Sequence, residues 1–371
     1  MANLFCVYTP FQFYVAQAIV IQEKLENNIL LMGYVADSSH FLDIYKILKI
    51  DGCWSDEILM TNISSWLNID LYHPIKSILK IHKDYSSIKT HLKKYDIDSI
   101  YLGDINNYTE RMMAQVLSKR RVRISFFEEG ASHYGERMVG GLLSHKPFIA
   151  TLYQTFFDWF LYLPLFKQRM GYSTFVKAAP LADIPIDSRY SIIPNFHESF
   201  DKRVYCRGLV SPRVSNLIKD ECKNINTSNS VLFLEQPIYE LVKDSISCYI
   251  QTIKDYFLQL HEDITIVIKY HPRETKEIKN TIENLFVSLG RKYIVISKEV
   301  NLPIEFYMEQ IKFKHVVNFI TSSAFYNGYL FDEVEFIYLI EEFYNNCKDA
   351  QLPEYKNLDN IMELYKKQLV K

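Results

Sequence analysis

The chain has 371 residues, of which 48% are hydrophobic, enough to fill the cores of two domains or of one large one. Its 42 basic and 44 acidic side chains nearly cancel, leaving a formal net charge of −2. This balance gives no overall field for nucleic acid, although a local basic cleft is compatible with it, and we expect no nucleic-acid partner.

Short apolar runs alternate with helical patterns through the first third of the chain. We predict strands at 3–8, 28–35, 57–60, 98–104 and 122–127. We predict helices at about 10–25, 40–49, 76–95 and 106–119, the first of them opened by Thr9-Pro10. This alternation is typical of a parallel sheet with helices on both faces.

The alternation stops after about residue 137 and returns in the second half. Residues 177–201 carry three prolines and mixed polarity, so we expect loops or a linker there. We then predict strands at 230–237, 264–272, 293–297, 314–320 and 334–340. The helices predicted beside them lie at 240–259, 275–289, 303–311, 322–330 and 355–369. The sequence therefore predicts two α/β halves of similar size.

The N-terminal sequence and one apolar segment bear on where the protein resides. "MANLFCVYTPFQF" lacks a basic region followed by a long apolar core, so it is not a signal peptide. The six cysteines show no CxxC spacing, which is typical of buried thiols in a reducing compartment. Residues 147–166 are almost entirely apolar, but Gln154 and Asp158 near their middle disfavour a membrane span. We expect a buried helix or one contacting lipid headgroups, in a cytoplasmic protein that is either free or peripheral at the inner membrane.

Polar side chains gather directly after the predicted strands, where parallel sheets bind their ligands. They are Glu128 and Glu129 after 122–127, Gln236 after 230–234, His271, Pro272 and Arg273 after 264–270, and Ser322 and Ser323 after 314–320. In a protein of two such halves, both sets of strand ends can face one cleft.

These residue types suit transfer of a group from a nucleotide donor to an acceptor hydroxyl. A carboxylate takes a proton from a hydroxyl nucleophile, and a histidine donates a proton or, as imidazolium, meets a phosphate leaving group. Two serines at a helix start offer hydroxyls and backbone N–H groups to an anion. Each motif alone has a plainer explanation, such as a solvated turn or an N-cap. Their joint placement favours the chemistry, and the common dinucleotide and P-loop signatures are missing from the sequence.

The combination resembles the bacterial sialyltransferases of the GT-B type, especially glycosyltransferase families 52 and 38. These families include lipooligosaccharide sialyltransferases and capsular polysialyltransferases. The matching stretches are "NLFCVYTPFQFYVAQAI", "FFEEG", "LFLEQPI", "KYHPRE" and "FITSSAF". They cover most of the chain in the family order, and the resemblance is weak in 140–225.

The resemblance implies a GT-B fold, in which two Rossmann-like domains with parallel sheets face a central cleft. Residues 1–205 would form the acceptor-side domain and 206–371 the nucleotide-sugar-binding domain. The implied reaction is a metal-independent, inverting transfer of sialic acid from CMP-sialic acid, without a cofactor. The acceptor would be a hydroxyl of a surface glycan, either lipooligosaccharide or capsule, including polysialic acid.

The resemblance also implies roles for the catalytic residues. One acid of "FFEEG" would be the general base, and we expect Glu129, with Glu128 as the open alternative. His271 would contact the CMP phosphate and assist its departure. In some family 52 members the base is instead an Asp near the stretch that here reads "LFLEQP". Ile238 follows this proline with no Asp beside it, which favours the motif acids, as in family 38.

A second set of residues would bind the donor. Ser322 and Ser323 match the paired serines that hold the phosphate, and Glu305 in "LPIE" matches a position expected to hold the ribose hydroxyls. The remaining predicted donor-binding residues are Pro272, Arg273 and Gln236.

Two other functions stay open at the level of the sequence. One is a GT-B transferase that uses a UDP or GDP sugar, which would keep the same sheet pattern. The other is a non-catalytic component of a polysaccharide assembly complex, which would tolerate loss of Glu129 and His271.

Overall fold

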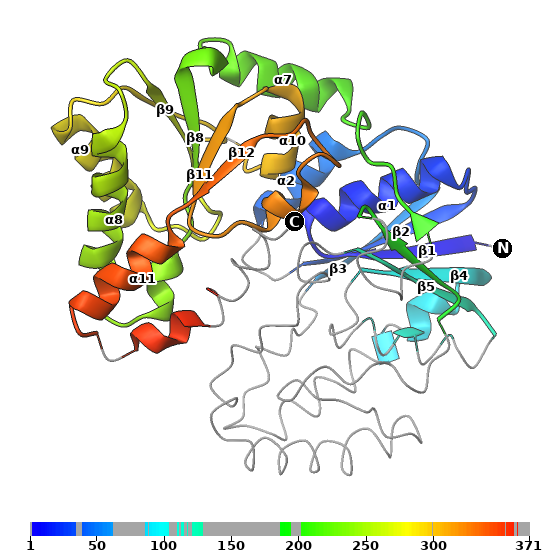
Figure 1. Cartoon of the computed structure of the whole chain (residues 1–371). Helices are drawn as coiled ribbons and strands as arrows, with labels where there is room; N and C mark the ends of the chain where they lie inside the picture. The colour runs from blue at the N-terminus through cyan, green and yellow to red at the C-terminus, as the bar shows by residue number, and fades with distance from the viewer. Residues whose placement is uncertain are drawn as a thin grey trace, which may run out of the picture. The chain divides into compact units, whose positions relative to one another are not determined.

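The computed structural model of the chain describes residues 2–34, 39–61, 89–103, 121–128, 186–193, 202–298, 300–352 and 354–359, with a few isolated positions between them. Contacts divide the chain into two compact units, Met1–Cys206 and Arg207–Lys371. Each unit is built on one parallel β-sheet (Figure 1). The α/β fold class predicted from the sequence is therefore confirmed.

The sheet of the first unit has seven parallel strands in the order β3-β2-β1-β4-β5-β6-β7. They span Ala2–Val7 (β1), Asn28–Tyr34 (β2), Asp56–Thr61 (β3), Ile97–Leu102 (β4), Arg123–Phe127 (β5), Ser188–Ser191 (β6) and Lys202–Arg203 (β7). Helix α1 (Pro10–Gln22) connects β1 to β2, and α2 (Ser39–Leu48) connects β2 to β3. The last four residues of β1, β4 and β5 are all buried, as expected for central strands of a parallel sheet.

Helix α1 begins at the predicted Thr9-Pro10 pair. Thr9 Oγ1 accepts the Gln12 N–H (3.1 Å) and Gln12 Oε1 accepts the Thr9 N–H (3.1 Å), a capping box that satisfies donors at the helix start. Every residue from Gln12 to Val20 is buried, so this helix lies inside the unit. Gly103, just after β4, makes room for it, because a Cβ there would lie 2.9 Å from Gln12 Nε2.

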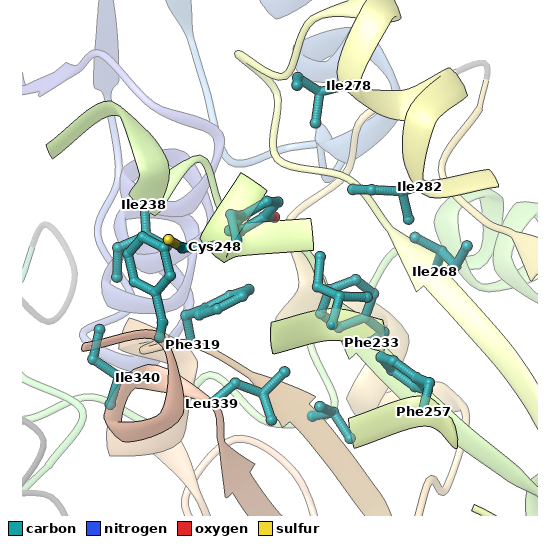
Figure 2. Close-up of a cluster of buried hydrophobic side chains, with 14 of the residues drawn as sticks. Phe233, Ile238, Cys248, Phe257, Ile268, Ile278, Ile282, Phe319, Leu339 and Ile340 are labelled. Atoms are coloured by element: carbon teal, nitrogen blue, oxygen red, sulfur yellow. The ribbon is translucent and has the colours of Figure 1, made fainter. Parts of the chain in front are cut away.

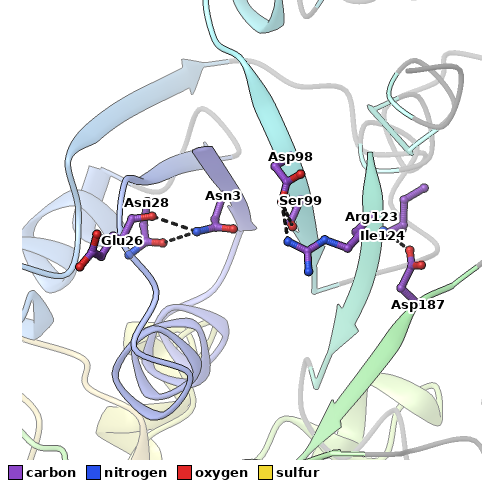
Figure 3. Close-up of polar contacts among 8 residues, drawn as sticks. All are labelled: Asn3, Glu26, Asn28, Asp98, Ser99, Arg123, Ile124 and Asp187. Atoms are coloured by element: carbon purple, nitrogen blue, oxygen red, sulfur yellow. Dashed lines mark hydrogen bonds and ion pairs between the residues drawn. The ribbon is translucent and has the colours of Figure 1, made fainter. Parts of the chain in front are cut away.

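Contacts between polar side chains join the amino ends of neighbouring strands in the first sheet (Figure 3). Arg123 at the start of β5 forms an ion pair with Asp98 of β4. Asn3 of β1 donates to the side-chain oxygen of Asn28 in β2 (3.0 Å). These contacts support the strand register at the edge opposite to Glu128, which follows the carboxyl end of β5.

The sheet of the second unit has five parallel strands in the order β10-β9-β8-β11-β12. They span Ser230–Leu234 (β8), Thr265–Lys269 (β9), Tyr293–Val295 (β10), His315–Asn318 (β11) and Glu335–Tyr338 (β12). The α-helices are α7 (Pro212–Cys222), α8 (Ile246–Gln259), α9 (Lys276–Ser288), α10 (Ile304–Gln310) and α11 (Ile340–Asp349). Four 3₁₀ helices occur among the described residues of this unit: η4 (Thr227–Asn229), η5 (Ile238–Leu241), η6 (Ser322–Tyr326) and η7 (Tyr355–Leu358).

Helices α8, α9 and α11 cover one face of the second sheet with an apolar core (Figures 1 and 2). Phe233 of β8 packs against Phe257 of α8 with ring centroids 5.2 Å apart, and Phe257 packs against Phe286 of α9 at 5.0 Å. Ile268 of β9 belongs to the same core. Because side chains alternate along a strand, the next residue, Lys269, points to the other face.

The structure corrects the predicted elements in several places. Strand β6 lies within 177–201, where loops were expected, because a short polar strand among prolines carries no apolar signal. The helix predicted at 322–330 is the short 3₁₀ helix η6. Helix α11 was not predicted, since it starts directly after β12 without a turn residue between them. Helix α7 was also not predicted, although Ser211-Pro212 is a regular helix start.

Some predictions fall on parts of the chain that the structure does not describe. They are the apolar segment 147–166, most of the helices predicted at 76–95 and 106–119, most of the helix predicted at 355–369, and Glu129.

Candidate active site

The carboxyl ends of β8, β9 and β11 lie side by side, because these strands are neighbours in the second sheet. Hydrogen bonds join the residues that follow them. His271 N–H donates to Glu235 Oε2 (3.2 Å), and Gln236 Oε1 accepts a backbone N–H at the end of β11 (2.9 Å). The Ser323 hydroxyl donates to Glu305 Oε1 at the start of α10 (2.6 Å). The structure thus brings these predicted residues of the second unit together at one edge of one sheet.

His271 has a defined ring orientation and charge. Its Nδ1 accepts the backbone N–H of Arg273 (3.2 Å), so the neutral ring carries its proton on Nε2. Burial lowers the pKa of His271 to about 4, and the positive charges of Arg273 and Lys269 act in the same direction. At neutral pH the free protein therefore presents a neutral imidazole that donates through Nε2–H, rather than an imidazolium.

Pro272 and Arg273 form the exposed tip of the turn that begins at His271. The Glu274 N–H donates to the His271 carbonyl (3.0 Å), which closes the turn. Arg273 is exposed and its positive charge acts on the His271 ring, so a guanidinium is available here to an anion.

Glu305 and Ser323 form a buried pair, 9% and 2% exposed. Burial raises the pKa of Glu305, and the hydrogen bond from Ser323 and the positive charge of Lys269 oppose this rise. Lys269 is 7% exposed and donates to Asn301 Oδ1 (2.9 Å). Burial lowers the pKa of Lys269 to about 8, so it stays cationic at neutral pH. A buried cation at the end of β9 thus acts on the buried Glu305 carboxyl of α10.

The two predicted phosphate-binding serines differ in their surroundings. Ser322 is exposed, whereas Ser323 gives its hydroxyl to Glu305 and its N–H to Thr321 Oγ1 (3.3 Å). The expected helix start with open N–H groups is instead a capped 3₁₀ turn. Ser322 is therefore the better placed of the two to reach a phosphate.

The Gln236 side chain bridges two strand ends. Its Nε2 donates to the Ile320 carbonyl, and its Oε1 accepts the Ile320 N–H (2.9 Å). The amide thus continues the hydrogen bonding between β8 and β11 beyond their ends. The predicted contact of Gln236 with the donor stays a prediction.

Glu128 is fully buried at the carboxyl end of β5 in the first unit. Its Oε2 accepts the backbone N–H of Ile192 (2.7 Å), which follows β6. The first acid of the pair therefore links two strand ends, and Glu129, outside the described residues, stays the predicted base.

Three buried ionisable residues at this edge of the second sheet are not among the predicted catalytic and donor-binding residues: Glu235, Lys269 and Glu274, all less than 10% exposed. For Glu235 and Lys269 the signal in the sequence is a charge directly after, or at the end of, an apolar run, as in "VLFLE" and "TIVIK". Such a charge is placed by the sheet at its ligand-binding edge.

A pocket of about 570 Å³ lies between α7 and the loop after β10. Its wall includes Glu221, whose Oε2 accepts the Tyr307 hydroxyl of α10 (2.6 Å), so the pocket adjoins the helix that carries Glu305. It is lined by Arg213, Leu217, Asp220, Glu221, Lys298 and Val300.

Comparison with known families decides what kind of protein carries this site. The sequence model of the family described as Alpha-2,8-polysialyltransferase (POLYST) matches residues 3–340. The chain belongs to the alpha-2,8-polysialyltransferase family. The match spans the first and second units and includes both motif acids, His271 and the paired serines.

Solved structures show the fold of this polysialyltransferase family member. It is similar to the UDP-GlcNAc 2-epimerase from Methanocaldococcus jannaschii, with 14% identity, a TM-score of 0.51, and 94% of this chain and 92% of that chain covered. It is also similar to UGT89C1 from Arabidopsis thaliana complexed with UDP-L-rhamnose, with 8% identity, a TM-score of 0.50, and 99% and 94% covered. The fold is of the GT-B type. No curated protein matches the sequence significantly.

The predicted resemblance is thus confirmed at the level of a polysialyltransferase family with a GT-B fold, and the protein is a glycosyltransferase. Such an enzyme uses a nucleotide-sugar donor and a glycan acceptor. Placement in family 52 or 38 stays a prediction. Within the part of the chain that the structure describes, we find no helix with both the length and the apolar character needed to cross a membrane.

Proposed function

We propose that the protein transfers sialic acid from CMP-sialic acid to a hydroxyl of a sialylated surface glycan. The observation that carries the proposal is the polysialyltransferase match over residues 3–340, because it includes every predicted catalytic residue. The assembly of His271, Glu305 and Ser323 at one sheet edge supports it, since nucleotide ligands bind at such edges.

In this proposal the second unit binds CMP. The Nε2–H of His271, the Arg273 guanidinium and the exposed Ser322 hydroxyl meet the phosphate, and Glu305 holds the ribose hydroxyls. The pocket beside α10 offers room for the cytosine ring of CMP. Lys269 keeps positive charge behind Glu305 and so favours its ionised form.

The reaction proceeds by inversion at the anomeric carbon of sialic acid. Glu129 takes the proton of the acceptor hydroxyl, and the acceptor oxygen forms a bond to that carbon. The bond from the carbon to the phosphate oxygen breaks, and its electron pair leaves with CMP. A phosphate group with a second pKa of about 6 leaves without needing a proton at neutral pH. A neutral His271 that donates a hydrogen bond is therefore sufficient to stabilise the departing charge.

The test is nucleotide release from CMP-sialic acid, compared with UDP-GlcNAc and GDP-mannose, in the presence of a sialylated acceptor. We expect acceptor-dependent release of CMP alone, strongly reduced in His271→Ala. Release of UDP or GDP instead would show a different donor. No turnover of any donor, together with no binding of CMP, would contradict the proposal and favour a non-catalytic component of an assembly complex.

A further inference from the structure

Behind His271 lie two carboxyl groups that the proposed reaction does not use. Glu235 directly follows β8 and is 2% exposed, and Glu274 ends the His271 turn and is 6% exposed. The hydroxyls that they accept, from Tyr249 and Tyr239, belong to rings in contact, with centroids 5.1 Å apart, and the neighbouring Glu274 helps to raise the pKa of Glu235. Two buried carboxylates so close together repel strongly unless one of them carries a proton.

Each oxygen of Glu235 already accepts a hydrogen bond. Oε1 accepts the Tyr249 hydroxyl of α8 (2.6 Å), and Oε2 accepts the His271 N–H (3.2 Å). The Glu235 N–H donates to the Lys269 carbonyl (3.0 Å), so its backbone is fixed as well. The carboxyl therefore connects β8 to both α8 and the His271 turn.

Glu274 has one satisfied and one unsatisfied oxygen. Oε1 accepts the Tyr239 hydroxyl (2.8 Å) and the Thr275 N–H (2.7 Å). Oε2 is buried and has no hydrogen-bond partner among the described residues. A buried carboxylate oxygen without a donor is costly, and a proton on the neighbouring Glu235 would supply the missing donor.

We propose that Glu235 and Glu274 share a single proton and, through it, act as positioning residues for His271. The shared proton removes the repulsion and satisfies Glu274 Oε2. The turn is then held from both sides, because Glu235 fixes the His271 N–H while the Glu274 N–H fixes the His271 carbonyl (3.0 Å).

The charges around the pair agree with a shared proton. Burial, together with Glu274, raises the pKa of Glu235 to about 9, while Tyr249 and the His271 N–H only partly oppose this. Tyr239 of η5, Tyr249 of α8 and Tyr270 at the end of β9 also face the pair, and all three are uncharged at neutral pH because burial raises their pKa. His271 faces Glu274 and is neutral as well. Arg273 and Lys269 are the cations beside the turn, and their charges act on His271.

The positioning of His271 by the Glu235–Glu274 pair should therefore fail at alkaline pH. Loss of the shared proton would place two negative charges between β8 and the His271 turn and drive them apart. The Nδ1 contact that sets the His271 tautomer would then loosen. The positioning role rests on the proposed function of His271, whereas the proton itself is present with or without a substrate.

Infrared spectroscopy of the whole chain without substrate tests the shared proton. The wild type should show the C=O stretch of a protonated carboxyl at neutral pH, lost as the pH passes about 9. This band should be missing in Glu235→Gln and kept in Glu240→Gln, whose glutamate is exposed on η5. A band unchanged in Glu235→Gln, or no band in the wild type, would overturn the proposal.

Nitrogen NMR of the His271 ring tests the positioning role. We expect the Nε2–H tautomer alone in wild type and Glu235→Gln, and a mixture of both tautomers in Glu235→Ala. A single unchanged tautomer in Glu235→Ala would overturn that role. A protein that passes both tests but does not turn over CMP-sialic acid would contradict only the proposed function.

Discussion

Ser323 donates its hydroxyl proton to Glu305 across 2.6 Å, so one serine of the pair is used inside the protein while its neighbour Ser322 is exposed. This bond links the turn after β11 to the start of α10. The paired serines therefore have two tasks rather than one. Ser323 orients the Glu305 carboxyl, and the exposed Ser322 stays the predicted contact to the donor phosphate.

The first prediction compares these serines. Ser323→Ala removes a hydrogen bond to a buried carboxyl, which we expect to lower the free energy of unfolding by about 1.5–3 kcal/mol. Ser322→Ala should change it by less than about 0.5 kcal/mol, as is usual for an exposed site, and should instead raise KM for the donor. Chemical denaturation and donor titration of both variants check this. Equal losses of stability in the two variants would contradict the assignment.

The second prediction concerns stability and pH. The pKa of Glu235 is raised from 4.5 to about 9, so between these values the folded state holds one proton more than the unfolded state. Stability is therefore greatest below the lower value and falls as the pH rises, by about 1.4 kcal/mol per pH unit for one proton. Glu235→Gln should fall less steeply through this window. Denaturation curves at several pH values measure the two slopes, and parallel slopes would speak against the shared proton.

The third prediction concerns His271. Its pKa is lowered from 6.5 to about 4, so the unfolded state binds the proton first as the pH falls. The stability that depends on a neutral His271 is therefore fully present above pH 6.5 and is lost as the pH falls towards 4. An NMR titration of the ring in the free protein should give a midpoint near 4, and bound CMP should raise it because a nearby anion favours the cation. A midpoint at 6.5 would mean that the imidazole is solvated.

The fourth prediction separates the two acids after β5. Glu128→Ala leaves the buried Ile192 N–H without its acceptor, which we expect to cost about 1–3 kcal/mol of stability. Glu129→Gln should leave the free energy of unfolding nearly unchanged and remove transfer activity. Unfolding midpoints and activity of both variants make the comparison. A stable but inactive Glu128→Ala protein would instead identify Glu128 as the catalytic base.

The sequence predicts the fold well where apolar periodicity and regular turn signals agree. The strand at 122–127 and the Thr9-Pro10 helix start are found as predicted, because a mostly apolar run and a capping box are local properties of the chain. Strand β6 carries no such signal, since its four residues are SRYS and its place in the sheet depends on distant pairing with β5.

The candidate site also combines features set by the local sequence with features that depend on distant contacts. The placement of His271 and Ser322 after strands is a local consequence of the parallel sheet. The links of Glu235 to His271 and of Ser323 to Glu305 join residues 36 and 18 positions apart, and only the packed structure shows them. For the same reason the low pKa of His271, which reflects burial and neighbouring charges, was not predicted.

The most direct test of the account is mass analysis of the glycan product formed from CMP-sialic acid. It would use a sialylated acceptor and a galactose-ended acceptor, with wild type and Glu129→Gln compared. We predict sialic acid addition to the sialylated acceptor by the wild type, with loss of that product in Glu129→Gln. An unmodified acceptor, or a sugar transferred only from a UDP or GDP donor, would contradict the account.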